Sequence, residues 1–190
     1  VCDLPGFLRA GDVLVFNDTR VIPAQLEGVR RSFKGGEASI GVTLHKRIDL
    51  RRWQAFIRNA KRLLPGDRIE FGAGVSAVAQ VRHEDGSFTL RFDGDDPVEL
   101  LLERAGRMPL PPYIARKRPA DAADLHDYQT MFADEPGAVA APTAALHFTP
   151  KLMDALAAAG IAHETLTLHV GAGTFLPVKA DDTTDHVMHA

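Results

Sequence analysis

The fold of this chain is decided by residues 137–170, which read GAVAAPTAALHFTPKLMDALAAAGIAHETLTLHV. The middle of this stretch, residues 152–159, is rich in alanine and leucine and predicts a helix. Thr149 is its expected N-cap, Pro150 occupies the first helical position, and Gly160 follows the last turn. A helix with apolar segments on both sides is the pattern of an α/β protein.

Apolar segments on either side of this helix predict two strands. Residues 137–141 have the composition of a short buried strand. After the helix, Leu166, Leu168 and Val170 alternate with polar residues, the period of a strand with one polar face. Strand, helix and strand over roughly 30 residues predict a βαβ unit with parallel strands. Residues 13–16 read as another buried strand that can join this sheet in parallel.

Polar, glycine or imidazole groups follow each of these strands. Ligands of open α/β sheets bind beyond the carboxyl ends of the strands, where loops carry chemistry while the strands stay buried. The segments concerned are residues 17–20, 140–143, 146–149 and 168–175. We therefore expect one cleft lined by Asp18, Thr143, His147 and His169.

The middle of the chain predicts a small antiparallel β-barrel. Between Leu26 and Phe92, short apolar-polar alternations are separated by turn sequences such as Pro65-Gly66-Asp67. A helix is expected after Pro97, ending at Gly106. The fold class is therefore α/β (α+β overall), an α/β part with a parallel βαβ unit plus a small barrel.

Composition sets broad limits on the kind of protein. The chain has 190 residues, of which 45% are hydrophobic, enough for a proper core. Its single cysteine, Cys2, excludes a disulfide framework. No apolar run approaches the ~20 residues that a membrane-spanning helix needs, so a cytoplasmic protein is the default expectation.

Basic residues are concentrated between Lys46 and Arg68. This stretch contains eight basic residues and only two acidic ones, Asp49 and Asp67. This local balance of +6 is typical of a phosphate-binding surface, although the net charge of the chain is -3. Trp53 and the neighbouring Phe56 can stack on unpaired bases. The alternative is that the aromatic residues belong to the core and the charges form a solvated rim.

Three blocks, residues 11–24, 137–149 and 166–178, resemble the signature segments of the S-adenosylmethionine:tRNA ribosyltransferase-isomerases of queuosine biosynthesis. Residues 111–114 and 128–129 lie between them in the family's order. The resemblance implies a β-barrel domain, residues 26–106, inserted into a discontinuous α/β catalytic domain formed by residues 1–25 and 107–190.

Three departures from the family's pattern accompany the resemblance. Gln25 stands where arginine is usual and Ala145 where glycine is usual. The sequence ends at Ala190, inside a block that resembles the family's His-x-Met-His-x-Glu. Because family chains extend further at both termini, we expect a fragment.

The resemblance also implies a reaction. The ribosyl part of S-adenosylmethionine passes to 7-aminomethyl-7-deazaguanine at the tRNA wobble position and is isomerised, giving epoxyqueuosine in the tRNA with release of adenine and methionine. S-adenosylmethionine is consumed as a substrate, so no cofactor is expected. The expected partners are this tRNA and S-adenosylmethionine, with no membrane, and a monomer is favoured.

The sulfonium acidifies the adjacent 5′ carbon, so the site needs a base, a donor for the departing adenine and a group that faces the sulfonium. His169 is the first candidate for the base because imidazole titrates near neutral pH. Asp18 is the second candidate, or the carboxylate that faces the sulfonium, and His147 can contact substrate. The structural alternatives are a core histidine, a turn-capping aspartate and a turn-closing histidine.

Further residues complete the predicted site. Thr149 and the N–H groups after it form an expected anion site at a helix N-terminus. The other predicted substrate-binding residues are Asn17, Thr19, Arg20, Pro142, Thr143, Phe148, Gly171, Gly173, Thr174 and Phe175. The predicted tRNA-binding residues are Lys46, Arg47, Arg51, Arg52, Lys61 and Arg62.

Two apparent signals do not change this interpretation. The glycines around Ala172 lack the third glycine of a dinucleotide fingerprint, because Leu176 occupies its position. His186 and His189 have the spacing of metal ligands, but nothing completes a tetrahedral set, so no metal is expected. A noncatalytic RNA-binding module and an α/β transferase acting on a free nucleoside remain the alternatives to a tRNA-modifying enzyme.

Overall fold

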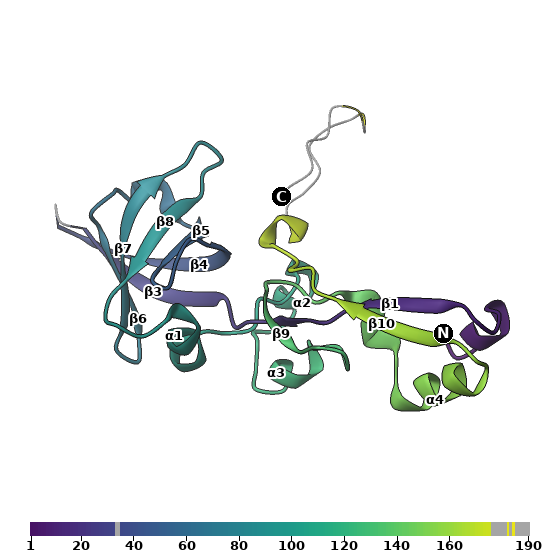
Figure 1. Ribbon diagram of the computed structural model, residues 1–190. Coiled ribbons are helices and arrows are strands. Elements are labelled where there is room, and N and C mark those ends of the chain that lie inside the picture. Colours follow the sequence, from purple (N-terminus) through teal and green to yellow (C-terminus); the bar gives the residue numbers. More distant parts are fainter. Residues whose placement is uncertain (33–34, 176–181, 183, 185–190) are drawn as a thin grey trace.

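The computed structural model describes residues 1–32, 35–175, 182 and 184. A β-barrel forms one end of the molecule, and short parallel strand pairs with helices form the other (Figure 1). The barrel strands are β3 (Gln25–Arg31), β4 (Glu37–Arg47), β5 (Arg52–Arg58), β6 (Arg68–Gly72), β7 (Val75–Arg82) and β8 (Phe88–Phe92).

The barrel predicted from the sequence is confirmed. It is closed in the order β3-β4-β5-β8-β7-β6, and every neighbouring pair is antiparallel. Along β4, Ile40, Val42 and Leu44 are buried in the barrel core, as their alternation with polar residues predicts. A 3-10 turn, η2 (Ala60–Arg62), follows β5.

Helix α1 (Val98–Ala105) follows Pro97 and ends before Gly106, as expected. Its buried residues Leu101 and Leu102 belong to the barrel core, so the helix packs against the barrel. Where the chain enters and leaves this region, Gln25 and Arg107 exchange backbone hydrogen bonds of 3.1 and 2.7 Å.

The remaining strands form two parallel pairs. β1 (Val13–Asn17) pairs with β10 (Ala162–Leu166), and β2 (Thr19–Val21) pairs with β9 (Glu135–Ala138). Only Asp18 separates β1 from β2. The helical elements of this part are η1 (Leu4–Phe7), α2 (Pro112–Ala115), α3 (Asp124–Asp127), η3 (Thr143–His147), α4 (Pro150–Ala158) and η4 (Ala172–Phe175).

Helix α4 has the predicted cap, with the Thr149 hydroxyl accepting a hydrogen bond from the Leu152 N–H at 3.3 Å. The mixed fold class is also confirmed. The predicted βαβ unit needs correction, because β9 and β10 do not share a sheet: each pairs with its own N-terminal strand. The N-terminal strand joins in parallel as predicted, but it is not fully buried, since Val13 and Val15 are 54% and 58% exposed.

The strand predicted to reach Val170 instead ends at Leu166. Beyond it, the Asn17 side chain replaces the ladder: its amide donates to the Leu168 carbonyl at 2.7 Å, and its oxygen accepts from the Leu168 N–H at 3.0 Å. The Val170 carbonyl then accepts from the Val139 N–H at 2.8 Å. His169 therefore lies in an irregular segment held by side-chain and backbone hydrogen bonds.

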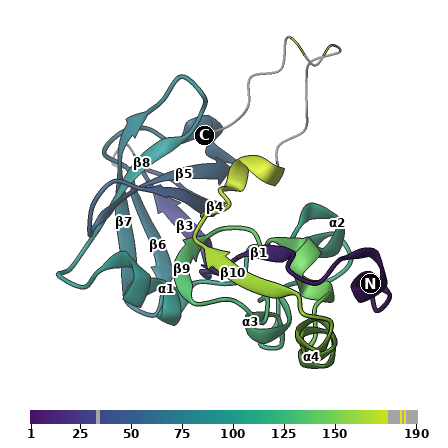
Figure 2. The same cartoon turned by 45° about the vertical axis from the view of Figure 1, so that its right-hand side comes forward.

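This segment brings the two parts of the molecule together. Val139 and Ala172 belong to the same buried cluster as the barrel core, and η4 packs against β4 (Figure 2). Leu152, Leu156 and other apolar residues form a separate small cluster beneath α4. Among the described residues, no helix is long and apolar enough to span a bilayer.

Candidate functional site

His169 is held in a fixed orientation by two contacts. Its Nδ1 lies 2.7 Å from the hydroxyl oxygen of Thr19, which is only 1% exposed. Its ring also lies over Gly137, where an added β-carbon would be 2.6 Å from Cε1. The ring is otherwise exposed. If Nδ1 carries the proton and donates a hydrogen bond to the Thr19 hydroxyl, Nε2 keeps a free lone pair and can act as a base. In the other tautomer Nε2 carries the proton and is a hydrogen-bond donor.

His169 lines a hollow of about 280 Å³ between the barrel and the parallel strands, which we call the junction hollow. The barrel contributes part of β4 and β5 together with Glu99 of α1, and the opposite wall comes from β9 and its neighbours. Its lining residues are Ile22, His45, Lys46, Arg47, Trp53, Glu99, Pro136, Gly137 and His169.

Charge and stacking organise the barrel side of this hollow. Arg47 pairs with one carboxylate oxygen of Glu99 at 3.4 Å. The His45 ring stacks on Phe56 with centroids 4.4 Å apart. Burial lowers the pKa of His45, and nearby Lys46 lowers it further, while Asp85 acts in the opposite direction. His45 is therefore neutral at physiological pH, with one donor and one acceptor nitrogen.

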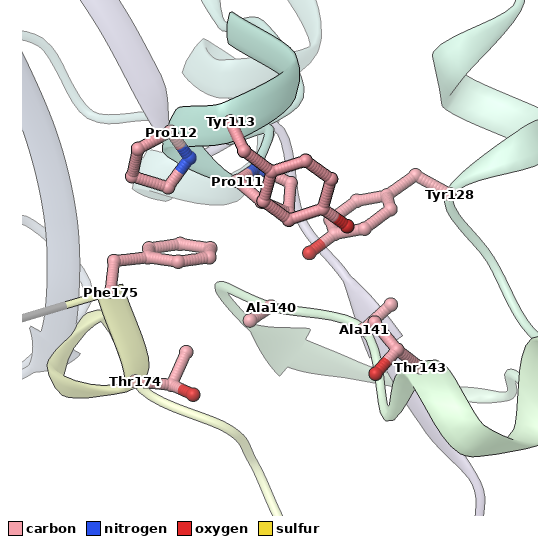
Figure 3. A pocket seen from close by; sticks show the side chains of 9 residues that line it. All are labelled: Pro111, Pro112, Tyr113, Tyr128, Ala140, Ala141, Thr143, Thr174 and Phe175. Atoms are coloured by element: carbon pink, nitrogen blue, oxygen red, sulfur yellow. The ribbon is translucent and has the colours of Figure 1, made fainter.

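A second hollow, the aromatic pocket, has a volume of about 420 Å³ and is shown in Figure 3. The ring of Phe175 faces into it from one side and that of Tyr113 from another. Its lining residues are Pro111, Pro112, Tyr113, Tyr128, Ala140, Ala141, Thr143, Thr174 and Phe175. Segments far apart in the sequence thus form one pocket rich in aromatic faces.

The two tyrosines of the aromatic pocket differ in environment. Tyr113 is 66% exposed, whereas Tyr128 is buried. Burial raises the pKa of the Tyr128 hydroxyl above its usual range. A hydrogen bond with the Ala141 backbone lowers this pKa in part, and the neighbouring Tyr113 raises it again. Tyr128 therefore remains protonated at neutral pH and can donate a hydrogen bond.

The same short segment, residues 168–175, forms walls of both hollows. His169 faces the junction hollow, and Thr174 with Phe175 faces the aromatic pocket. Gly171 and Gly173, predicted to bind substrate, lie within this segment.

Asp18 and His147 do not line the junction hollow or the aromatic pocket. Asp18 accepts a hydrogen bond from the Thr167 hydroxyl at 2.7 Å, and His147 is exposed at the end of η3. Asp18 directly precedes Thr19, the partner of His169, whereas Thr143 lines the aromatic pocket together with Thr174 and Phe175. The expectation of one cleft shared by Asp18, Thr143, His147 and His169 stays a prediction.

Asn17, Arg20, Phe148 and Thr149 have structural partners. Both polar atoms of the Asn17 side chain bond to backbone, as described above. Arg20 donates to the Ala133 carbonyl at 3.0 Å, and Phe148 packs edge-on against Phe16 with centroids 4.8 Å apart. Arg20 and Phe148 also line a third hollow, of about 680 Å³.

Two further predictions concern groups near helical starts. Pro142 is half-buried and directly precedes η3. At α4, Pro150 has no N–H and the Leu152 N–H is taken by the cap, so fewer donors remain for an anion than the sequence predicts.

The basic residues of the barrel do not form one uniform surface. Lys46 and Arg47 lie at one end of the β4–β5 ladder, whereas Lys61 and Arg62 follow its other end, about 20 Å away at ~3.3 Å per residue. Five of the eight basic side chains pair with carboxylates: Arg47 with Glu99, Arg51 with Asp95, Arg52 with Asp49, Arg58 with Glu27, and Arg68 with Asp93. Lys46, Lys61 and Arg62 have no ion pair among the described residues.

Several lining residues were not identified from the sequence as site residues. His45 and Glu99 carry no motif, and Tyr113 and Tyr128 appeared only as part of the family's blocks. No group of three metal-ligating side chains occurs within the described residues, and His186 and His189 lie outside them.

Comparison with known proteins agrees with the sequence resemblance. The chain is 77% identical over 190 residues to the S-adenosylmethionine:tRNA ribosyltransferase-isomerase of Rhizorhabdus wittichii, covering 100% of this chain and 54% of that protein. It is 59% identical over 190 residues to the protein of the same name from Zymomonas mobilis, with coverages of 100% and 54%.

A crystal structure of S-adenosylmethionine tRNA ribosyltransferase from Thermotoga maritima is 27% identical, with a TM-score of 0.38, and the match covers 89% of this chain and 44% of that one. The chain spans about half the length of the curated relatives it matches. The family described as queuosine biosynthesis protein matches over residues 1–190. The chain therefore belongs to the queuosine biosynthesis protein family.

Proposed function

We propose that this chain carries part of an enzyme that transfers and isomerises the ribosyl moiety of S-adenosylmethionine onto 7-aminomethyl-7-deazaguanine at the tRNA wobble position. The products are epoxyqueuosine in tRNA, adenine and methionine. The observation that carries the proposal is the aromatic pocket, because residues from four of the segments that resemble the family converge on it, with Tyr128 among them.

The pocket suits a sulfonium nucleoside. Aromatic faces attract cations, and Tyr113, Tyr128 and Phe175 supply such faces around the pocket. Its volume of about 420 Å³ lies in the range of small-molecule sites, roughly 300–1,000 Å³. The protonated hydroxyl of Tyr128 can donate to the departing adenine.

His169 is the proposed base that removes a proton from the 5′ carbon beside the sulfonium. Loss of that proton gives an ylide. Its electron pair forms a C4′–C5′ double bond as the C4′–O4′ bond breaks, and the O4′ electrons then form a carbonyl at C1′ as adenine leaves. The amine of the deazaguanine attacks this carbonyl carbon, and methionine leaves with the C5′–S electron pair when the carbon ring and the epoxide close. The contact with Thr19 supports this role when Nδ1 donates, because Nε2 then keeps its lone pair. Tying the imidazole to a buried hydroxyl also limits the entropy that must be lost on reaching the reactive geometry.

Adenine release from S-adenosylmethionine tests the proposal, using the full chain with and without substrate tRNA. We expect release that depends on the tRNA, and a His169→Asn variant slowed by ~100-fold or more with little change in S-adenosylmethionine binding. Absence of release from the intact enzyme contradicts the proposed function. Normal release by the variant assigns the proton transfer to another group.

A further inference from the structure

Three buried polar atoms without hydrogen-bond partners lie on residues of the junction hollow. They are Nε1 of Trp53, Nε2 of His45 and Oε2 of Glu99. Five such side-chain atoms occur in the described part of the chain, so more than half belong to this one hollow. Trp53 is only 3% exposed. Buried polar groups are normally paired, and a cluster of unpaired ones around a hollow indicates a ligand that completes them.

The chemistry of these atoms restricts the ligand. The Trp53 indole N–H can only donate, whereas the Glu99 carboxylate can only accept. Each carboxylate oxygen has two lone pairs, so Oε1, which forms an ion pair with Arg47 at 3.4 Å, and Oε2, which has no partner, can both accept hydrogen bonds from a ligand. Lys46 adds a cationic donor at the same hollow. The ligand must therefore present donors and an acceptor side by side.

The Watson–Crick edge of a guanine-type base has this pattern. Its N1–H and 2-amino group donate next to each other, and its O6 accepts. Adenine offers one amino donor beside an acceptor nitrogen, which a carboxylate would repel. A 7-deazaguanine keeps the guanine edge, because the change at position 7 lies on the opposite side of the purine.

We infer that the junction hollow binds the guanine-type edge of an unpaired RNA base, with Glu99 accepting from N1–H and the 2-amino group and with Trp53 or Lys46 donating to O6. The inference rests on the proposed function and assigns the base-binding half of the site. A hollow of about 280 Å³ suits one base taken out of its stack, as enzymes that modify a base require.

The position of His169 agrees with this assignment. It lines the junction hollow, and its own segment continues to Thr174 and Phe175 in the aromatic pocket. The modified base and the ribosyl donor would thus occupy hollows that share one wall. Glu99 acts here as a specificity-determining residue, distinct from the proposed base.

The test is base discrimination in RNA binding, measured with the full chain and without S-adenosylmethionine. The probes are anticodon stem-loop RNAs that differ only at the wobble base: 7-aminomethyl-7-deazaguanine, guanine or adenine. We expect the first two to bind about 5-fold to 150-fold more tightly than the adenine RNA, the range for one bidentate base contact. Glu99→Gln should bring this ratio close to one.

Glu103→Gln is the matched control, because Glu103 is exposed on the same helix. It should retain the full ratio. Trp53→Phe keeps an aromatic ring but removes the N–H, and its ratio should fall less than that of Glu99→Gln. Melting temperatures of all variants show whether the barrel still folds.

Two results would overturn the inference: intact protein that binds all three RNAs equally, or folded Glu99→Gln that keeps the wild-type ratio. The second result includes a Glu99→Gln variant that binds all three RNAs uniformly more weakly with the ratio unchanged. Failure of the proposed function is seen separately, as absence of adenine release, and leaves a measured base preference intact.

Discussion

The imidazole of His169 occupies the space where any side chain at position 137 would begin. A β-carbon on Gly137 would lie 2.6 Å from Cε1 and 2.8 Å from both ring nitrogens. The ring cannot keep this position beside alanine, because real β-carbons do not approach so closely. Gly137 is therefore part of the geometry that places the proposed base.

Gly137→Ala should displace the His169 ring and lower kcat for tRNA-dependent adenine release by ~10-fold to 100-fold, since small displacements of a catalytic group are costly. Steady-state kinetics on the full chain measure this. Gly6→Ala is the control: Gly6 is exposed and has no atom within 4 Å of the added carbon, so its kinetics should match wild type. Unchanged kcat in Gly137→Ala would show that the ring position is unimportant for turnover.

The hydroxyl of Thr19 should be needed for turnover rather than for substrate affinity. Thr19→Val keeps the shape of this buried side chain but removes the partner of His169 Nδ1. We expect kcat to fall by ~10-fold with little change in the KM for S-adenosylmethionine, the signature of lost positioning. Thr19→Ser should restore most of the activity. Equal losses in the valine and serine variants would point to packing instead of the hydrogen bond.

The aromatic pocket should discriminate a charged from a neutral ligand. Tyr113→Leu is expected to weaken S-adenosylmethionine binding by about 2-fold to 30-fold, the range of a cation–π contact. The neutral thioether S-adenosylhomocysteine should be affected less, and Tyr113→Phe should behave like wild type. Isothermal titration calorimetry gives these affinities. Equal weakening for both ligands would exclude a role of the ring in recognising the sulfonium.

The Arg118–Asp124 pair predicts a loss of stability in acid. Arg118 donates hydrogen bonds of 2.7 and 2.6 Å to the Asp124 carboxylate and lowers its pKa from 3.8 to about 2. Because the folded-state pKa is depressed, this contribution is present above about pH 3.8 and is lost as the pH falls towards 2.

Arg118→Gln should therefore lower the melting temperature at neutral pH and flatten its fall between these two pH values. Circular dichroism melts across the acid range test this, with the exposed neighbour Arg116→Gln as control. Some pH dependence should persist, because hydrogen bonds also lower the pKa of Asp49 and Asp85. A variant with the wild-type acid profile would contradict the assignment.

Basic residues without carboxylate partners should matter most for tRNA. Replacing Lys61 and Arg62 with glutamine is expected to weaken tRNA binding and to reduce its salt slope by about one unit per lost phosphate contact. The same change at Arg51 and Arg52 should have a smaller effect, because these side chains already pair with acids. Filter binding across salt concentrations compares the two double variants. Equal effects of both would mean that the ion pairs do not limit phosphate binding.

Local sequence patterns predicted the barrel, α1 and the cap of α4 correctly. Each depends on neighbours in the chain: the alternation through Ile40 to Leu44, the turn at Pro65, or the sequence from Thr149 to Pro150. The pairing of β9 and β10 could not be read in this way. It depends on residues 13–21, more than a hundred positions away, and on Asn17 taking over the hydrogen bonds of a strand.

The residues of the candidate site also differ in whether local sequence could identify them. The blocks around Thr143, His169 and Phe175 drew attention to segments that line the two hollows, because polar and glycine residues follow apolar ones there. Glu99 could not be identified from the sequence as a lining residue of the junction hollow, because in a helix that begins at Val98 it resembles an ordinary surface residue. Its significance arises only from the barrel-to-strand contact that closes the junction hollow.

Because residues 168–175 form a wall of both hollows, we expect occupancy of one to change the affinity of the other. A ligand that favours one placement of this segment changes the affinity at the second hollow, and linkage requires the effect to be equal in both directions. RNA and S-adenosylmethionine are thus expected to bind with a coupling free energy. A sulfonium that is activated only when the acceptor base is in place is protected from wasteful loss of adenine.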